Sequence, residues 1–195
     1  MIFVFLGPPG AGKGTQSRLL AADLDLKIIE VGAYLRAKRQ ENDELGRLIK
    51  NLIDRGENVP GSVLMEVIGP DLLNYYQKPG VIVDNFLRQK DQVESWLRFS
   101  QKHSLKIDVI IHLKASLSVC WQRIQLRNQK EHRQDDSYQI FLKRYNQVYQ
   151  EHIDEVLSAF KGNTPILEVN AQPPIEEVYQ DIVKQLKGLG LWTKK

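Results

Sequence analysis

Short runs of apolar, mostly β-branched residues recur along the chain, separated by longer segments with a helical spacing of apolar positions. Such short runs are typical of strands that are buried on both faces of a parallel sheet. They lie at residues 2–6, 27–31, 80–84, 108–113 and 165–169. We therefore expect about five buried strands.

Helical periodicity fills most of the sequence between these runs. The predicted helices cover residues 13–24, 33–40, 43–55, 62–77, 89–103, 116–128, about 134–160, and 174–187. Regular alternation of strand and helix predicts right-handed crossovers and an α/β fold with a doubly wound parallel sheet. Ligands of such sheets bind at the carboxyl ends of the strands, so candidate chemistry is expected there.

A chain of 195 residues can form one domain with a sizeable core, and we expect a single domain over residues 1–195. Two connections exceed one crossover helix: we interpret residues 32–79 as a helical insertion and residues 127–136 as a short lid. The remaining core comprises residues 1–31, 80–126 and 137–195.

Composition restricts the class of protein. Lys and Arg number 27 and Asp and Glu 24, a net charge of +3 without long blocks of like charge, so we expect neither a nucleic-acid partner nor a membrane. Cys120 is the only cysteine, which favours a reducing compartment, and we expect the cytoplasm. The N-terminal apolar run lacks a basic lead and predicts a strand, not a targeting signal.

Residues 7–16 read GPPGAGKGTQ and join the first predicted strand to the first helix. Gly7, Gly12 and Lys13 have the spacing of a phosphate-binding loop, in which backbone N–H groups and a helix N-terminus surround an anion. A glycine-rich turn without a ligand is the alternative, but the lysine and the flanking elements disfavour it. Lys13 would neutralise a terminal phosphate.

The residue after Lys13 is Gly14, and the hydroxyl comes one position later at Thr15. This Gly-Thr-Gln ending resembles that of the adenylate kinase family of nucleoside monophosphate (NMP) kinases. Further motifs extend the resemblance from residue 2 to about 187: Gly32, Leu35 and Arg36; Asp84, Phe86, Arg88 and Gln92; Arg123 and Arg127; the stretch Arg133-Gln134-Asp135-Asp136; and Arg144. The short gap between Arg127 and Arg133 resembles the abbreviated lid of short-form members.

The resemblance implies a P-loop NTPase-type fold and a set of residue roles. ATP would be bound by Gly10, Ala11, Gly12, Lys13, Gly14, Thr15, Arg123 and Arg127. The catalytic residues would be Lys13, Asp84, Arg88, Arg127, Arg133 and Arg144. Mg²⁺ would arrive with ATP and be held through water near Asp84 and Thr15, without a direct protein ligand. Taken alone, Asp84 is also consistent with a helix cap, and Arg123 with Arg127 with a solvated surface.

The monophosphate would be bound by Val31, Arg36, Glu57, Asn58, Val59, Asn85, Arg88, Gln92, Arg133 and Arg144. Four positions here depart from the family pattern: Val31, Ala33, Asn85 and Leu87. Leu87 replaces a proline whose preceding bond is typically cis. Because a cis bond before a non-proline residue costs about 2.5–4 kcal/mol, we expect a trans bond and an altered path for the loop that carries Arg88.

We therefore expect a monomeric, adenylate kinase-like phosphotransferase that moves the γ-phosphate of ATP reversibly to AMP, giving two ADP. Gln92 favours AMP as the acceptor. The departures leave two alternatives: a kinase for CMP, UMP or a deoxynucleotide, and a nucleotide-binding protein with weakened catalysis.

Overall fold

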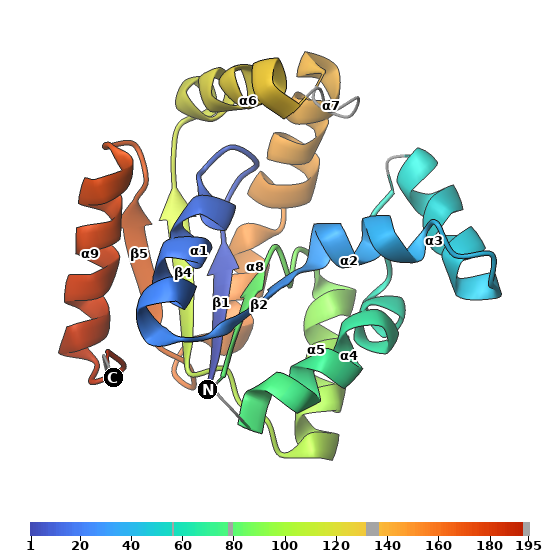
Figure 1. Ribbon diagram of the computed structural model, residues 1–195, viewed down its shortest axis with the longest axis horizontal. Helices are drawn as coiled ribbons and strands as arrows, with labels where there is room; N and C mark the ends of the chain where they lie inside the picture. The colour runs from blue at the N-terminus through green and yellow to red at the C-terminus, as the bar shows by residue number, and fades with distance from the viewer. Residues whose placement is uncertain (56, 78–79, 132–136, 193–195) are drawn as a thin grey trace.

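The computed structural model describes residues 1–55, 57–77, 80–131 and 137–192 (Figure 1). Its centre is a parallel five-stranded sheet with the strand order β2-β3-β1-β4-β5. The strands are β1 (Ile2–Leu6), β2 (Lys27–Glu30), β3 (Val81–Asp84), β4 (Val109–Lys114) and β5 (Ile166–Asn170). The predicted fold class is confirmed, and each strand end lies within one residue of its predicted position.

Strand β1 is the middle strand, and the sheet register brings polar residues to its carboxyl end. Phe5 lies beside Asp84 of β3, and Leu6 lies beside His112 of β4. In Figure 1 the loop that leaves β1 lies above the tips of the strands and leads into helix α1 (Lys13–Leu24). The sheet therefore assembles one polar edge from segments that are far apart in the sequence.

Helices cover both faces of the sheet. They are α1 (Lys13–Leu24), α2 (Val31–Lys38), α3 (Glu44–Asp54), α4 (Gly61–Gln77), α5 (Lys90–His103), α6 (Leu117–Glu131), α7 (Tyr138–Lys143), α8 (Ile153–Phe160) and α9 (Ile175–Gly188), with a π-helix, η1 (Arg144–Gln150). Phe3 and Phe5 of β1 pack with α1, α6 and α9, whereas Ile2 and Val4 pack with α4, α5 and α8. Within the described residues, no helix has the length and apolar content needed to cross a membrane.

The helix predicted over about 134–160 is wrong as a single element. Its described part divides into α7, η1 and α8, and the N-cap of α7 is Ser137, whose side chain accepts from the Ile140 N–H. Two tyrosines hold η1 to the sheet: the Tyr145 hydroxyl donates to the Ala115 carbonyl (3.2 Å), and the Tyr149 hydroxyl lies 2.9 Å from His112 Nε2. We attribute the wider helical turn to these tertiary contacts.

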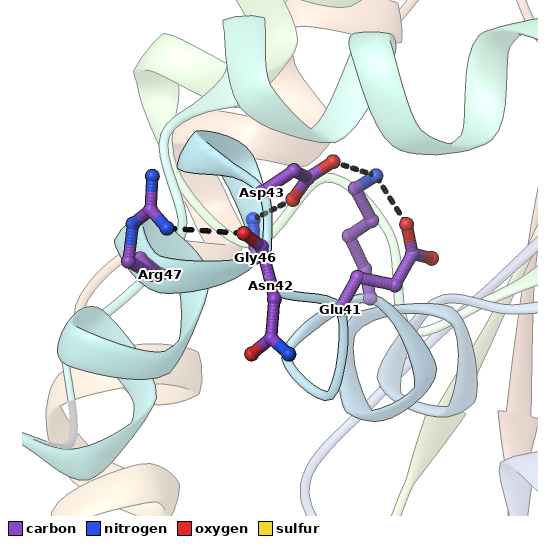
Figure 2. A network of polar contacts seen from close by, with 6 residues as sticks. Glu41, Asn42, Asp43, Gly46 and Arg47 are labelled. Atoms are coloured by element: carbon purple, nitrogen blue, oxygen red, sulfur yellow. Dashed lines mark hydrogen bonds and ion pairs between the residues drawn. The ribbon is translucent and has the colours of Figure 1, made fainter.

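The connection between α2 and α3 is fixed by a polar network (Figure 2). Lys38 Nζ lies 2.8 Å from Glu41 Oε2 and 2.6 Å from Asp43 Oδ2. The other Asp43 oxygen accepts from the Gly46 N–H at 2.7 Å, which caps α3, and Arg47 donates to the Asn42 carbonyl. All these contacts join residues between Lys38 and Arg47, so they stabilise the turn and the N-terminus of α3 locally.

We expect His112 to make the stability of the fold dependent on pH. Burial lowers the pKa of His112 from 6.5 to about 4, so between these values the unfolded chain binds a proton that the folded chain does not. The free energy of unfolding should therefore fall by about 1–3 kcal/mol as pH falls from 7 to 4.5. Urea unfolding should show a smaller fall in the His112→Gln variant. Equal pH dependence in the two proteins would contradict this assignment.

Candidate functional site

The loop between β1 and α1 is built on glycines with positive φ. Gly7, Gly10 and Gly12 have φ values of 144°, 86° and 94°. A Cβ at Gly7 would lie 2.5 Å from the Leu113 carbonyl oxygen, and one at Gly10 would lie 2.4 Å from that of Cys120. A Cβ at Gly12 would meet no atom within 4 Å. The loop is thus packed against β4 and α6 on one side and open at Gly12.

Helix α1 begins inside this loop and presents its N-terminus to the open side. Gly12 is the N-cap and contributes no side-chain cap, and its carbonyl accepts from the N–H groups of Thr15 and Gln16. The preceding N–H groups at the start of a helix have no acceptor within it. Those of Lys13 and Gly14 are therefore suited to bind an anion, which the helix dipole also favours.

Lys13 lies over the loop that precedes it. Its ammonium donates to the carbonyls of Gly7 (2.8 Å) and Pro8 (3.0 Å). Burial lowers the pKa of Lys13 to about 8; Asp84 opposes this shift, and Arg88 and Arg127 add to it. An incoming phosphate would offset this electrostatic cost, because it favours the charged form of the amine.

Asp84 ends β3 beside the loop, and it is 9% exposed. Its Oδ1 is buried and has no hydrogen-bond partner among the described residues, and its Oδ2 would lie 3.5 Å from a Cβ at Gly14. Burial raises the pKa of Asp84, and Lys13 opposes the shift. The N-cap of α5 is Gln89, so the alternative of Asp84 as a helix cap is wrong.

Arg88 is held from two directions. Its backbone N–H donates to Gln92 Oε1 (2.8 Å), and its Nε donates to Asn85 Oδ1 (3.0 Å). Burial and the nearby charge of Arg144 lower the pKa of Arg88 to about 10, against the effect of Asp84. The amide of Gln92 also donates to the Val59 carbonyl, so this predicted base-reading side chain supports the loop itself.

The distal arginines approach the same edge of the sheet. Arg127 lies on α6 and its charge acts on Lys13, while Arg144 begins η1 and its charge acts on Arg88. Arg123 donates to the carbonyls of Ala171, Gln172 and Pro173, which join β5 to α9. Its predicted stacking on adenine stays a prediction. Arg133, Asp135 and Asp136 lie outside the described residues.

The other residues predicted to bind the monophosphate have fewer contacts with the arginines, Lys13 and Asp84. Val31 and Val59 are buried in one core cluster, and Asn58 donates to Gln89 Oε1 (2.6 Å). Glu57 is exposed and lies 3.9 Å from Arg55. Arg36 is exposed on α2, and no contact between described residues joins it to Arg88. A separate cavity of about 630 Å³ lies in the insertion, lined by Ala33, Tyr34, Ala37, Lys38, Glu41, Leu45, Glu66 and Val67.

The loop from Asn85 to Arg88 has an unusual backbone. Asn85 and Leu87 have φ values of 69° and 59°. A left-handed conformation costs roughly 1–2 kcal/mol in a non-glycine residue. Leu87 is 1% exposed, and burial of a leucine contributes about 1.5–3 kcal/mol, which offsets this cost. Because proline is restricted to φ near −65°, this path is closed to the proline of the family pattern. The trans Phe86–Leu87 bond stays a prediction.

Comparison with known proteins identifies the family to which this arrangement corresponds. The family model described as "Adenylate kinase" matches residues 5–164, which is most of the chain. The chain belongs to the adenylate kinase family. Among its relatives, an adenylate kinase of Rhodopirellula baltica is 31% identical over 186 residues, covering 95% of each chain. One from Elusimicrobium minutum is 33% identical over 211 residues, covering 94% of this chain and 97% of the relative.

The matched segment of the adenylate kinase family contains Lys13, Asp84, Arg88 and Arg144. Sequence reasoning missed two features of the site: Tyr145 and Tyr149, which hold the helix that begins at Arg144, and the hydrogen bond that Arg88 Nε donates to Asn85 Oδ1. The spacing of the tyrosines, four residues apart, was a signal for the first. Nothing in the sequence alone signals the second.

Two glycine-to-alanine substitutions should destabilise the fold to different extents, because Gly10 is closely packed and Gly12 faces open space. Gly10→Ala places a methyl group against the Cys120 carbonyl and should destabilise the fold by about 3 kcal/mol or more. Gly12→Ala has similar backbone strain but no clash, and it should cost about 1–2 kcal/mol. Urea unfolding would measure both. A larger loss for Gly12→Ala would contradict this description of the loop.

Proposed function

We propose that the protein transfers the γ-phosphate of ATP reversibly to AMP, giving two ADP, with Mg²⁺ as the cofactor of ATP. The proposal rests on the clustering of positive charge at the carboxyl edge of the sheet: Lys13 and Arg88 act on Asp84, Arg127 acts on Lys13, and Arg144 acts on Arg88. Such a site suits a transfer between two phosphates, in which charge develops on several oxygens. Family membership supports the same reaction.

The described residues perform the reaction by position and charge. The N–H groups at the start of α1 bind the donor phosphates, and Lys13 neutralises the group in transfer. Arg88 binds the acceptor phosphate, since a guanidinium fork matches two phosphate oxygens. Arg127 and Arg144 stabilise charge between donor and acceptor. No covalent intermediate with the protein is required.

Asp84 fits a role beside a hydrated Mg²⁺. Its buried Oδ1 has no hydrogen-bond partner among the described residues, and it ends a strand next to the phosphate loop. Carboxylates commonly hold Mg²⁺ through its water ligands. Mg²⁺ would neutralise and orient the donor phosphates when it is bound. Thr15 lies in the first turn of α1 and would be the second group near this ion.

The proposal also includes the setting of the reaction. We infer a monomer that acts in the cytoplasm on free nucleotides and has neither a nucleic-acid nor a membrane partner. The low net charge and the buried, free thiol of Cys120 support this inference. The comparisons do not favour the two alternatives, a kinase for another monophosphate and a binding protein with weak catalysis.

A panel assay tests the reaction and its alternatives. The protein is incubated with Mg-ATP and AMP, CMP, UMP or deoxynucleoside monophosphates, and diphosphate formation is followed. We expect the highest kcat/KM with AMP and a loss of at least about 100-fold in Lys13→Ala, because the variant lacks the charge that stabilises the transferred group. Lys27→Ala, at the exposed amino end of β2, is the matched control. Turnover of none of these substrates would contradict the proposal.

The role of Asp84 predicts a change in Mg²⁺ requirement. Activity should be lost in excess chelator and restored by Mg²⁺. In Asp84→Asn, the Mg²⁺ concentration for half-maximal activity should rise about 10-fold, because the neutral amide attracts the hydrated ion less. Glu30→Gln removes the neighbouring carboxylate on β2 and should change it less than about twofold. An unchanged requirement in Asp84→Asn would exclude this role.

A further inference from the structure

Arg88 is bonded through both its side chain and its backbone, to residues of its own loop and of the following helix. Asn85 Oδ1 accepts from Nε, and Gln92 Oε1 accepts from the backbone N–H. A long arginine side chain otherwise retains considerable rotational freedom. The bond to Gln92 fixes the backbone position of Arg88, and the bond to Asn85 restricts the orientation of its guanidinium group.

The backbone makes the Asn85 contact possible. Asn85 and Leu87 both have left-handed φ values, so the backbone between β3 and α5 turns at two of three successive residues. Leu87 points into the core, where it is 1% exposed. This turn brings the Arg88 side chain back to the residue three positions earlier, and the short amide of Asn85 reaches its Nε at 3.0 Å.

The chemistry of the contact suits a phosphate-binding arginine. The Nε–H is one of five guanidinium donors, and its use leaves the two terminal nitrogens as donors for a bidentate contact. An amide oxygen is neutral, so it orients Arg88 without cancelling its charge, whereas the carboxylate of Asp84 attracts the same group and Arg144 repels it. The bond to Asn85 thus gives the guanidinium a fixed neutral contact while two charged residues act on it.

We propose that Asn85 is a positioning residue that presents the Arg88 guanidinium to the phosphate of the acceptor monophosphate. This inference rests on the proposed function and adds a role to Asn85, which stands where the family pattern has glycine. In this chain the asparagine side chain orients the arginine that the turn carries. Its contribution is to the acceptor side of the reaction alone.

A merely structural explanation makes a different prediction. Asparagine is the residue that tolerates a left-handed φ best after glycine, so it could serve the backbone alone. In that case glycine would replace Asn85 without loss. If Asn85 positions Arg88, glycine would relax the backbone and still impair the reaction.

The test compares Asn85→Gly with Asn85→Ala. Both remove Oδ1, but glycine relieves the backbone strain and alanine retains it. We expect KM for the monophosphate to rise about 10-fold in both variants, as for the loss of a hydrogen bond to a charged group, with KM for ATP changed less than about twofold. Thermal stability should be equal or higher in Asn85→Gly and lower in Asn85→Ala. Wild-type kinetics in Asn85→Gly would overturn the proposal.

A double-mutant cycle isolates the pair. Lysine has no counterpart of Nε–H, so in an Arg88→Lys background the further change Asn85→Gly should alter KM for the monophosphate less than about twofold. An additional 10-fold rise in that background would mean that Asn85 acts on the substrate by another route, and the proposal would be wrong.

The bond between Arg88 and Asn85 can also be tested in the absence of substrate. The Arg88 Nε–H signal in a ¹⁵N-labelled protein can be assigned by its absence in Arg88→Lys. We expect its hydrogen exchange with water to be at least about 10-fold faster in Asn85→Gly, because the acceptor is lost. Unchanged exchange would overturn the positioning role. If the wild-type protein transferred no phosphate, the proposed function would fail, and this signal would still decide the role of Asn85.

Discussion

The whole site depends on one close approach of backbones, where the loop after β1 passes the carbonyls of Leu113 and Cys120 without a Cβ between them. Gly7 and Gly10 permit this contact, and both have φ values that favour glycine. The contact holds the start of α1 above the carboxyl ends of β1 and β4. Lys13 donates to the carbonyls of this loop, so its ammonium group also lies there.

The second constraint is electrostatic. The sheet register places Asp84 next to this loop, and the turn after β3 adds Arg88, while α6 and η1 bring Arg127 and Arg144. Burial of positive groups is costly, as the lowered pKa values of Lys13 and Arg88 indicate. A polyanionic ligand reverses this cost, because it adds opposite charge inside a partly desolvated site. The electrostatic cost of the buried positive charges and the proposed affinity for phosphates therefore have the same origin.

Much of this organisation is predictable from sequence, for identifiable physical reasons. Continuous apolar runs located the five strands within one residue, since burial on both faces leaves little freedom in composition. The phosphate loop was predictable because its glycines and lysine have fixed spacing. The π-helix η1 was not, because its turn depends on Tyr145 and Tyr149 contacting β4 and the residue that follows it. The Asn85–Arg88 bond likewise depends on backbone angles that propensities do not specify.

We propose that backbone amides and Lys13 at the start of α1 bind a chain of phosphates. Calorimetric titration of the purified protein with Mg-ATP, and separately with adenosine, tests it most directly. We expect saturable heat with Mg-ATP and binding at least about 100-fold weaker with adenosine, since phosphate contacts would supply most of the affinity. Equal affinity for the two ligands, or no heat with Mg-ATP, would contradict it.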